Sequence, residues 1–239
     1  MNIAIILAAA GCGSRMEAKQ NKVLLHLAGQ PLLCYSLHLF QKDPLVSRIL
    51  VTAAPGDMEA FRELLLPYEK ARLCLGGASR QESVFLALQA LQQEADGTEL
   101  PWDRVAIHDG ARPLLSRSDW QRLLEAAESA PAALLLRPMT DTVKQITEGK
   151  VFATIPRETL AAALTPQIFE TKLLLEAYAA AKEGGYSATD DAELVEKLGF
   201  CPLAVPAKEP NPKITFPADL ILAEALLAAR QQRKESPEK

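Results

Sequence analysis

Residues 3–22 read IAIILAAAGCGSRMEAKQNK, and this stretch indicates the fold class of the chain. Its first part, Ile3 to Leu7, is a continuous apolar run with the length of a strand buried on both faces. The next part, Ala8 to Ser14, has almost no side chains, so it offers backbone N–H groups in a concavity that suits phosphate oxygens. Arg15 and Lys22 add two cations beside it. We interpret the stretch as a cradle for a nucleoside triphosphate.

Two well-known glycine-rich motifs are absent from this loop. A dinucleotide fingerprint would need a third glycine at Met16, and no Gly-Lys-Ser or Gly-Lys-Thr follows at P-loop spacing. A glycine-rich turn can also simply connect a strand to its helix. On local pattern alone, both interpretations stay open.

Length and composition fit one α/β domain. The chain has 239 residues, 49% hydrophobic and 23% charged. We expect a single domain over residues 1–232 and a disordered tail over 233–239. No apolar run approaches the roughly 20 residues of a membrane span, and no basic segment precedes the apolar start, so we expect a cytoplasmic protein without membrane contact.

The net charge limits the classes of binding partner, and the cysteine spacing limits the kinds of cysteine site. The net charge of −4 argues against binding nucleic acid but permits a local basic pocket. The four cysteines show no CxxC spacing, which favours reduced thiols over zinc or disulfides.

Strands and helices are predicted to alternate along the chain. The predicted strands are 3–7, 47–53, 72–75, 104–109, 132–137 and 200–205. The predicted helices are 31–41, 57 onward, 79 onward, 119–129, 166–182, a short helix that residues 187–191 cap and that ends at 198, and 217–231. Because the strands lack polar alternation, we expect a mostly parallel, Rossmann-like sheet with helices on both faces.

Residues 138–158 interrupt this alternation. Two extended segments flank Glu148-Gly149-Lys150, which predicts a projecting β-hairpin arm. The sheet does not need this arm, so its predicted use is packing against another subunit or reaching over a site. Thr142 and Arg157 are its candidate ligand contacts, with plain exposed residues as the alternative.

Two further motifs follow predicted strands. Gly76-Gly77 leads into a helix with Ser79, Arg80 and Ser83 in its first turns, where anions bind, although Ser79 and Glu82 also suit an ordinary capping box. Asp109 and Arg112 stand at the C-terminal end of the predicted strand that begins at Arg104. They are a candidate hydroxyl or hydrated-Mg²⁺ ligand and a candidate phosphate ligand, unless they form only a surface ion pair.

Seven ordered motifs together resemble a known family. They are Ala9 to Met16, Gly76-Gly77 with Arg80 to Val84, His108 to Pro113, Asp141 to Lys144, Ala163 to Gln167, Thr189-Asp190 and Pro212 to Thr215. This set resembles the cytidylyltransferase family that makes 4-diphosphocytidyl-2-C-methyl-D-erythritol in the non-mevalonate isoprenoid pathway. The resemblance covers nearly the whole chain.

The resemblance implies a Rossmann-type nucleotidyltransferase that transfers the cytidylyl group of CTP to the polyol phosphate 2-C-methyl-D-erythritol 4-phosphate, with Mg²⁺ bound to CTP. It also implies a homodimer that exchanges hairpin arms. Arg15 and Lys22 are implied as catalytic cations, and Asp109 as a metal ligand acting through water. The implied substrate-positioning residues are Arg157, Lys213, Asp109, Arg112, Thr142, Thr165 and Thr189. The implied nucleotide-binding residues are Ala9, Ala10, Gly11, Gly13, Gly77, Ala78 and Ser83.

Some alternatives remain at this stage. The family usually has Pro-Lys-Gln around its second catalytic lysine, whereas this chain has Asn21-Lys22-Val23, and Lys19 is a rival for that role. Asn211-Pro212-Lys213 replaces the more usual Asn-Ile-Lys. A ribitol 5-phosphate cytidylyltransferase is the alternative enzyme, and a noncatalytic nucleotide-binding regulator is the alternative of another class.

Overall fold

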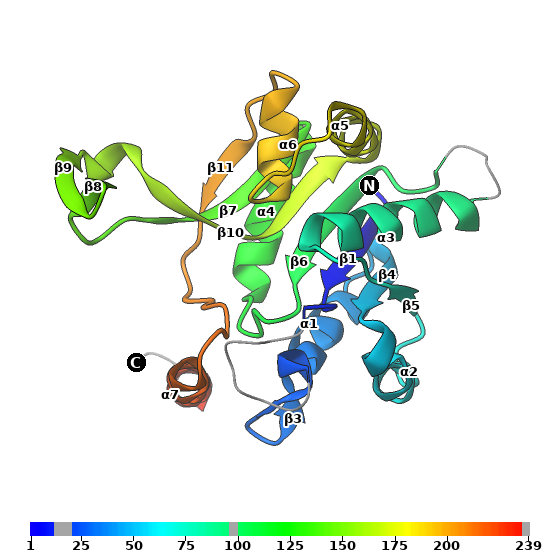
Figure 1. Ribbon diagram of the computed structural model, residues 1–239. Coiled ribbons are helices and arrows are strands. Elements are labelled where there is room, and N and C mark those ends of the chain that lie inside the picture. The colour runs from blue at the N-terminus through cyan, green and yellow to red at the C-terminus, as the bar shows by residue number, and fades with distance from the viewer. Residues whose placement is uncertain (12–20, 96–99, 236–239) are drawn as a thin grey trace.

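The computed structural model describes residues 1–11, 21–95 and 100–235 (Figure 1). The strands are β1 (Ile3–Ala8), β2 (His26–Leu27), β3 (Gln30–Pro31), β4 (Val46–Ala53), β5 (Ala71–Leu75), β6 (Arg104–Asp109), β7 (Ala132–Pro138), β8 (Val143–Thr147), β9 (Lys150–Ile155), β10 (Ala161–Glu170) and β11 (Leu203–Pro206). The α-helices are α1 (Leu32–Gln41), α2 (Met58–Leu65), α3 (Arg80–Glu94), α4 (Arg117–Ser129), α5 (Thr171–Gly184), α6 (Asp191–Lys197) and α7 (Pro217–Glu235). Short 3-10 helices are η2 (Lys22–Leu24), η3 (Pro55–Asp57) and η4 (Arg157–Thr159).

A seven-stranded sheet forms the centre of the molecule, in the order β11-β7-β10-β6-β1-β4-β5. Neighbouring strands are parallel except at β10, which runs antiparallel to both β6 and β7. β1 lies between β4 and β6, with Ala8 opposite Thr52 and Asp109. The carboxyl ends of these three strands therefore meet at one edge, where open α/β sheets bind ligands. The expectation of a mostly parallel α/β sheet is confirmed.

The side chains of β1 supply both cores of the protein. Ile3, Ile5 and Leu7 pack with residues of α1, α2 and α4 on one face of the sheet. Ala4 and Ile6 pack with α3, α5 and α6 on the other face. All five are completely buried, and burying an isoleucine or leucine contributes about 2 kcal/mol. This two-sided burial explains why the sequence of β1 is apolar without alternation.

The predicted helix over residues 166–182 is wrong at its beginning. Residues 166–170 belong to β10, and α5 begins only at Thr171. The segment from Leu164 to Phe169 is buried throughout, between β6 and β7. The misassigned part begins with Pro166, and a proline is common at the first position of a helix, so the sequence pattern favoured a helix start at this point.

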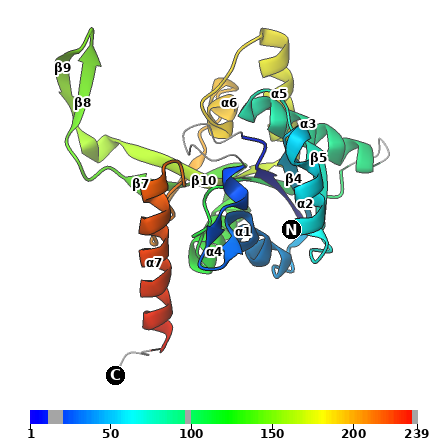
Figure 2. The ribbon, with the colours of Figure 1, turned by 60° about the horizontal axis from the view of Figure 1, so that its bottom comes forward.

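The predicted hairpin is confirmed as β8 and β9, joined at Glu148 and Gly149, which both have positive φ. This is the backbone that a two-residue hairpin turn needs, and glycine adopts it readily. The hairpin extends away from the sheet (Figure 2) and exposes Ile146, Val151 and Phe152. The apolar side chains at its tip are therefore open to a partner.

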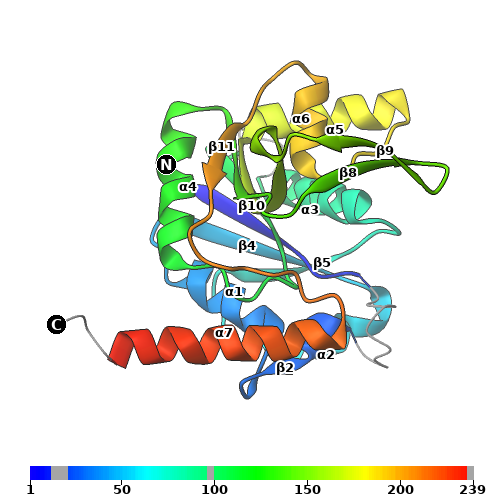
Figure 3. The same ribbon diagram turned by 90° about the vertical axis from the view of Figure 1, so that its left-hand side faces the viewer.

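The last helix, α7, lies beside α1 and the small β2–β3 sheet (Figure 3). Its partly buried Leu220, Leu226 and Leu227 pack on a third apolar cluster that includes Leu27 and Leu114. α7 continues to Glu235, so it takes in the beginning of the segment that we expected to be a tail. Among the described residues, no helix is long and apolar enough to cross a membrane.

Candidate active site

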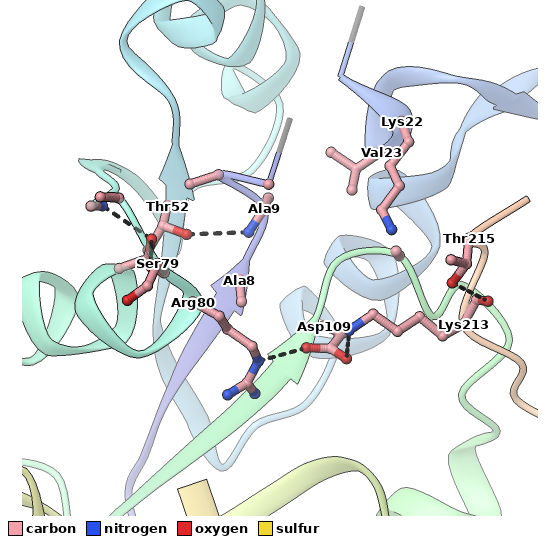
Figure 4. A pocket seen from close by; sticks show the side chains of 16 residues that line it. Ala8, Ala9, Lys22, Val23, Thr52, Ser79, Arg80, Asp109, Lys213 and Thr215 are labelled. Carbon is pink, nitrogen blue, oxygen red and sulfur yellow. Dashed lines mark hydrogen bonds and ion pairs between the residues drawn. The ribbon is translucent and has the colours of Figure 1, made fainter. Parts of the chain in front are cut away.

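A cavity of about 480 Å³ lies over the carboxyl ends of β1, β4 and β6 (Figure 4). The described residues that line it are Ala8, Ala9, Ala10, Gly11, Lys22, Val23, Thr52, Gly77, Ala78, Ser79, Arg80, Ser83, Asp109, Ala111, Lys213 and Thr215. The cavity brings together residues from the beginning, middle and end of the chain. We refer to it as the active-site pocket.

The loop after β1 is held by two buried polar side chains. Ala9 donates its N–H to Thr52 Oγ1 at 3.2 Å, and its carbonyl accepts from Asn21 Nδ2 at 2.8 Å. Asn21 also caps η2, since its Oδ1 accepts from the N–H of Val23. The asparagine at the family's usual proline position therefore fixes the helix that begins with Lys22. Figure 4 shows the Lys22 side chain pointing into the pocket.

The glycine pair after β5 lets the second loop approach the first. A Cβ at Gly76 would collide with the Cβ of Ala10. The N–H of Gly77 donates to Ser83 Oγ at 3.0 Å, and Ser83 in turn donates to the Ser79 carbonyl at 2.8 Å. These contacts place the backbone of residues 77 and 78 along the pocket wall.

The beginning of α3 combines the capping and the ligand-facing interpretations of this motif. Ser79 is the N-cap and accepts from the N–H of Glu82 at 3.0 Å, while a Glu82 carboxylate oxygen accepts from the N–H of Ala78 at 2.6 Å. The cap orients the positive end of the helix dipole toward the pocket, where negative charge is stabilised.

Asp109 at the end of β6 is surrounded by cations. Arg80 Nε lies 3.0 Å from its Oδ1, while Lys213 Nζ and Arg112 Nε lie 2.8 and 3.5 Å from its Oδ2. Burial alone would raise the pKa of Asp109, but the charges of Arg80, Lys213 and Arg112 together lower it below its ordinary value. Asp109 is therefore ionised at neutral pH.

Thr165 supports Asp109 from behind the pocket. His108 Nε2 lies 3.1 Å from the Arg112 carbonyl, which can only accept, so Nε2 carries the proton. The neutral ring then accepts from Thr165 Oγ1 at Nδ1, and the same hydroxyl accepts from the N–H of Asp109 at 3.1 Å. Burial lowers the pKa of His108 to about 4, consistent with a neutral ring.

This buried histidine is expected to make stability depend on pH. The pKa of His108 is near its ordinary 6.5 in the unfolded chain and about 4 in the folded chain, so unfolding takes up a proton between these values. The contribution of His108 to the free energy of unfolding is fully present above the unfolded pKa. It is lost as the pH drops toward 4, by about 3 kcal/mol in total. When the free energy of unfolding is measured with denaturant at several pH values across this range, it should change more steeply with pH for the wild type than for His108→Gln.

The control for this measurement is His26→Gln, because His26 is exposed on β2. Its stability should follow the wild-type pH dependence. Equal slopes for the wild type and His108→Gln would show that His108 is not held neutral by the fold.

The structure separates the predicted site residues into three groups. Ala9, Ala10, Gly11, Lys22, Gly77, Ala78, Ser83, Asp109 and Lys213 line the pocket. Arg112, Thr165, Thr142, Arg157 and Thr189 are not among its lining residues. Arg15, Gly13 and the rival Lys19 lie outside the described residues.

The residues of the second group differ in whether they contact Asp109. Arg112 and Thr165 contact Asp109 directly. Thr189 is exposed before α6, and its N–H donates to Glu193 at 2.6 Å. Thr142 and Arg157 are exposed at the base of the hairpin, where Arg157 donates to the Thr140 carbonyl at 2.6 Å.

Lys213 reaches the pocket because its segment is tied to the loop after β6. Asn211 is buried, and its Oδ1 accepts from the N–H of Leu114 at 3.0 Å. Ile214 donates its N–H to the Ala111 carbonyl at 2.8 Å. Proline at position 212 therefore leaves the lysine in place.

Several residues that line the pocket were not among the predicted site residues. Thr52 is completely buried in an apolar strand, and nothing in its neighbourhood distinguishes it from a core threonine. Arg80 and Ser79 belong to a motif that we recognised. Because a cation is unfavourable at the positive end of a helix dipole, the arginine at this helix N-terminus is the signal that could have identified Arg80. Thr215 follows Lys213 and its hydroxyl donates to the Lys213 carbonyl.

The described residues are suited to a metal ion carried by a substrate rather than to a protein cage. They contain no cluster of three His, Cys, Asp or Glu side chains that could hold a metal. Asp109 is the only carboxylate among the described lining residues, and both of its oxygens are paired with cations. Mg²⁺ commonly keeps several waters and takes substrate phosphates as ligands, so this donor set fits a contact to Asp109 through water.

Comparison with known proteins gives a consistent result. The family model described as 2-C-methyl-D-erythritol 4-phosphate cytidylyltransferase matches residues 3–229. The protein of that name from Halalkalibacterium halodurans is 39% identical over 98% of this chain and 100% of its own length. The structure of the protein of that name from Thermus thermophilus is 34% identical, with a TM-score of 0.76 over 95% of this chain and all of that chain. The structure of 4-diphosphocytidyl-2C-methyl-D-erythritol synthase from Anaerococcus prevotii is 27% identical, with a TM-score of 0.82 over 95% and 96% of the two chains.

Proposed function

Because this chain belongs to the 2-C-methyl-D-erythritol 4-phosphate cytidylyltransferase family, we propose that its active-site pocket carries out that family's reaction. The protein is a cytidylyltransferase of the non-mevalonate isoprenoid pathway. It transfers the cytidylyl group of CTP to 2-C-methyl-D-erythritol 4-phosphate and releases pyrophosphate. The observation that supports this pocket most strongly is Asp109, held among three cations beside the Lys22 side chain.

The pocket would bind CTP across the loop after β1. The backbone from Ala9 to Gly11 would lie along the triphosphate. Because the N–H of Ala9 is donated to Thr52, the N–H groups of Ala10 and Gly11 would stabilise the phosphate oxygens. The N–H groups of Gly77 and Ala78 are already donated within the loop, so the carbonyls of this segment would accept the cytosine amino group. Ser83 would take part in reading the same base.

The chemistry would need positioning and charge stabilisation but no covalent intermediate. An oxygen of the 4-phosphate attacks the α-phosphorus of CTP, and the bond between that phosphorus and the leaving pyrophosphate breaks. Lys22, with Arg15, would stabilise the negative charge that develops at the α-phosphate. Lys213 would hold the attacking phosphate, and Asp109 with Arg112 would orient the polyol.

Mg²⁺ is proposed as the metal that accompanies CTP. The triphosphate would supply most of its ligands, and Asp109 would contact it through water. When bound, it would neutralise part of the phosphate charge.

A homodimer with exchanged arms is proposed as the functional unit. Arg157 and Thr142 do not line the pocket of their own chain, and the arm exposes Ile146, Val151 and Phe152. Burial of these side chains against a second copy would remove apolar surface from water and bring the two polar residues to the partner's pocket. Both substrates are small phosphorylated metabolites, and we propose the cytoplasm as the compartment where the enzyme acts.

Pyrophosphate release with a panel of substrates tests the proposed reaction. We expect turnover with CTP and 2-C-methyl-D-erythritol 4-phosphate, and at least about 100-fold lower kcat/KM with UTP because the cytosine amino group is lost. Ribitol 5-phosphate should be a poor acceptor. Faster turnover of ribitol 5-phosphate than of methylerythritol phosphate would contradict the substrate assignment, and no turnover of either would contradict the enzyme assignment.

A further inference from the structure

Arg80, the first residue of α3, bridges two buried carboxylates from different elements. Its Nε donates to Asp109 Oδ1 at 3.0 Å, and its Nη2 donates to Asp191 Oδ2 at 2.8 Å. The Asp109 and Asp191 side chains are 8% and 1% exposed. One planar guanidinium therefore fixes the end of β6 relative to the beginning of α6.

Asp191 is itself fixed from the other side. Its Oδ1 accepts from the Tyr178 hydroxyl at 2.5 Å, and Tyr178 is buried in α5. Burial, followed by the Asp191 charge, raises the pKa of Tyr178, so the hydroxyl remains a donor. Arg80 is thus held on its far side by Asp191, which Tyr178 holds in turn, and neither of these two side chains lines the pocket.

The two closest cations of Asp109 differ in their freedom to leave it. Arg80 has a second carboxylate partner, and its side chain is 27% exposed. Lys213 contacts Oδ2 at 2.8 Å through a side chain that is 39% exposed. A lysine ammonium on a flexible stem can turn to another anion, whereas an arginine clamped by two carboxylates stays.

We infer that Arg80, anchored by Asp191, is a positioning residue for cytidylyl transfer. It holds Asp109 through Oδ1, so that Lys213 can exchange Oδ2 for the phosphate of the polyol substrate. Without the anchor, Arg80 is no longer fixed on Oδ1, so Asp109 pairs more strongly with its remaining cations, Lys213 at 2.8 Å and Arg112 at 3.5 Å, and the closer pairing keeps the lysine from the phosphate. The inference rests on the proposed function. It predicts that removing the anchor weakens binding of the polyol phosphate and leaves binding of CTP unchanged.

Steady-state kinetics of Asp191→Asn tests this inference. The change removes the anchoring charge with little change in side-chain size. We expect the KM for methylerythritol phosphate to rise about 10-fold, as for loss of a hydrogen bond to a charged group, with less than about a 2-fold change in the KM for CTP. Arg80→Lys keeps the charge but cannot span both carboxylates, so it should shift the same KM in the same direction.

The matched control is Glu196→Gln, which neutralises an exposed carboxylate on the same helix and should have wild-type kinetics. Thermal unfolding checks that the variants are folded. If Asp191→Asn is not folded, the kinetics of Arg80→Lys test the inference in its place. An equal rise of both KM values, or wild-type values in the folded variants, would overturn the inference. Wild-type enzyme with no turnover of CTP and methylerythritol phosphate would instead refute the proposed function, so the two failures are distinguishable.

Discussion

Replacing Lys22 by alanine is expected to lower kcat by about 100-fold or more. Lys22 lies at the beginning of η2 and lines the pocket, and Asn21 ties this helix to the β1 loop. Its charge would act where negative charge grows during transfer, so the loss should appear in kcat more than in the KM for CTP. The measurement is pyrophosphate release at saturating concentrations of both substrates.

Lys19→Ala is the control for this change, because Lys19 is the rival cation in the same segment. We expect it to keep most of the wild-type kcat. A large loss in Lys19→Ala with normal turnover in Lys22→Ala would reverse the assignment. Lys22→Arg should recover only part of the rate, since a guanidinium differs from an ammonium in shape and in donor geometry.

Replacing Arg157 by alanine is expected to lower turnover by about 100-fold, because a misplaced attacking phosphate loses its alignment with the α-phosphorus. The more informative result comes from mixing this variant with Lys22→Ala. If the arm serves the partner's pocket, a mixed dimer has one pocket with both changes and one pocket with neither. Equal amounts of the two weak variants should then recover about a quarter of wild-type activity after subunits exchange.

The mixture has clear contrary outcomes. No recovery, with mixed dimers demonstrated by tagged subunits, would place Arg157 in the pocket of its own chain. A protein that sediments as a monomer at assay concentrations, with full activity, would contradict the exchanged arm itself. Neither result would alter the role expected for Lys22.

The sequence could predict those parts of the fold that depend on local pattern. The β1 run is apolar on both faces because it supplies both cores, and the hairpin turn has a glycine where the backbone needs positive φ. β10 was missed because its Pro166 resembles the first residue of a helix. Only its pairing with β6 and β7 distinguishes it, and that pairing joins residues far apart in the chain.

Contacts between distant segments of the chain also limited the prediction of the pocket. Lys213 and Asp109 could be named from motifs, but their 2.8 Å contact joins segments about a hundred residues apart. The role of Asp191 had no local signal, because at a helix N-terminus an aspartate is usually a cap or a favourable charge. Only the tertiary structure shows that Asp190 takes the capping role while Asp191 faces Arg80.

The most direct test of the proposed chemistry follows the phosphate oxygens. Methylerythritol phosphate in which all three nonbridging phosphate oxygens are the heavy isotope is incubated with CTP and enzyme, and the product is examined by phosphorus NMR. Direct attack at the α-phosphorus predicts that the oxygen bridging the two phosphorus atoms of the product is labelled and that the released pyrophosphate is not. An unlabelled bridge, or label in the pyrophosphate, would contradict this account of the active site.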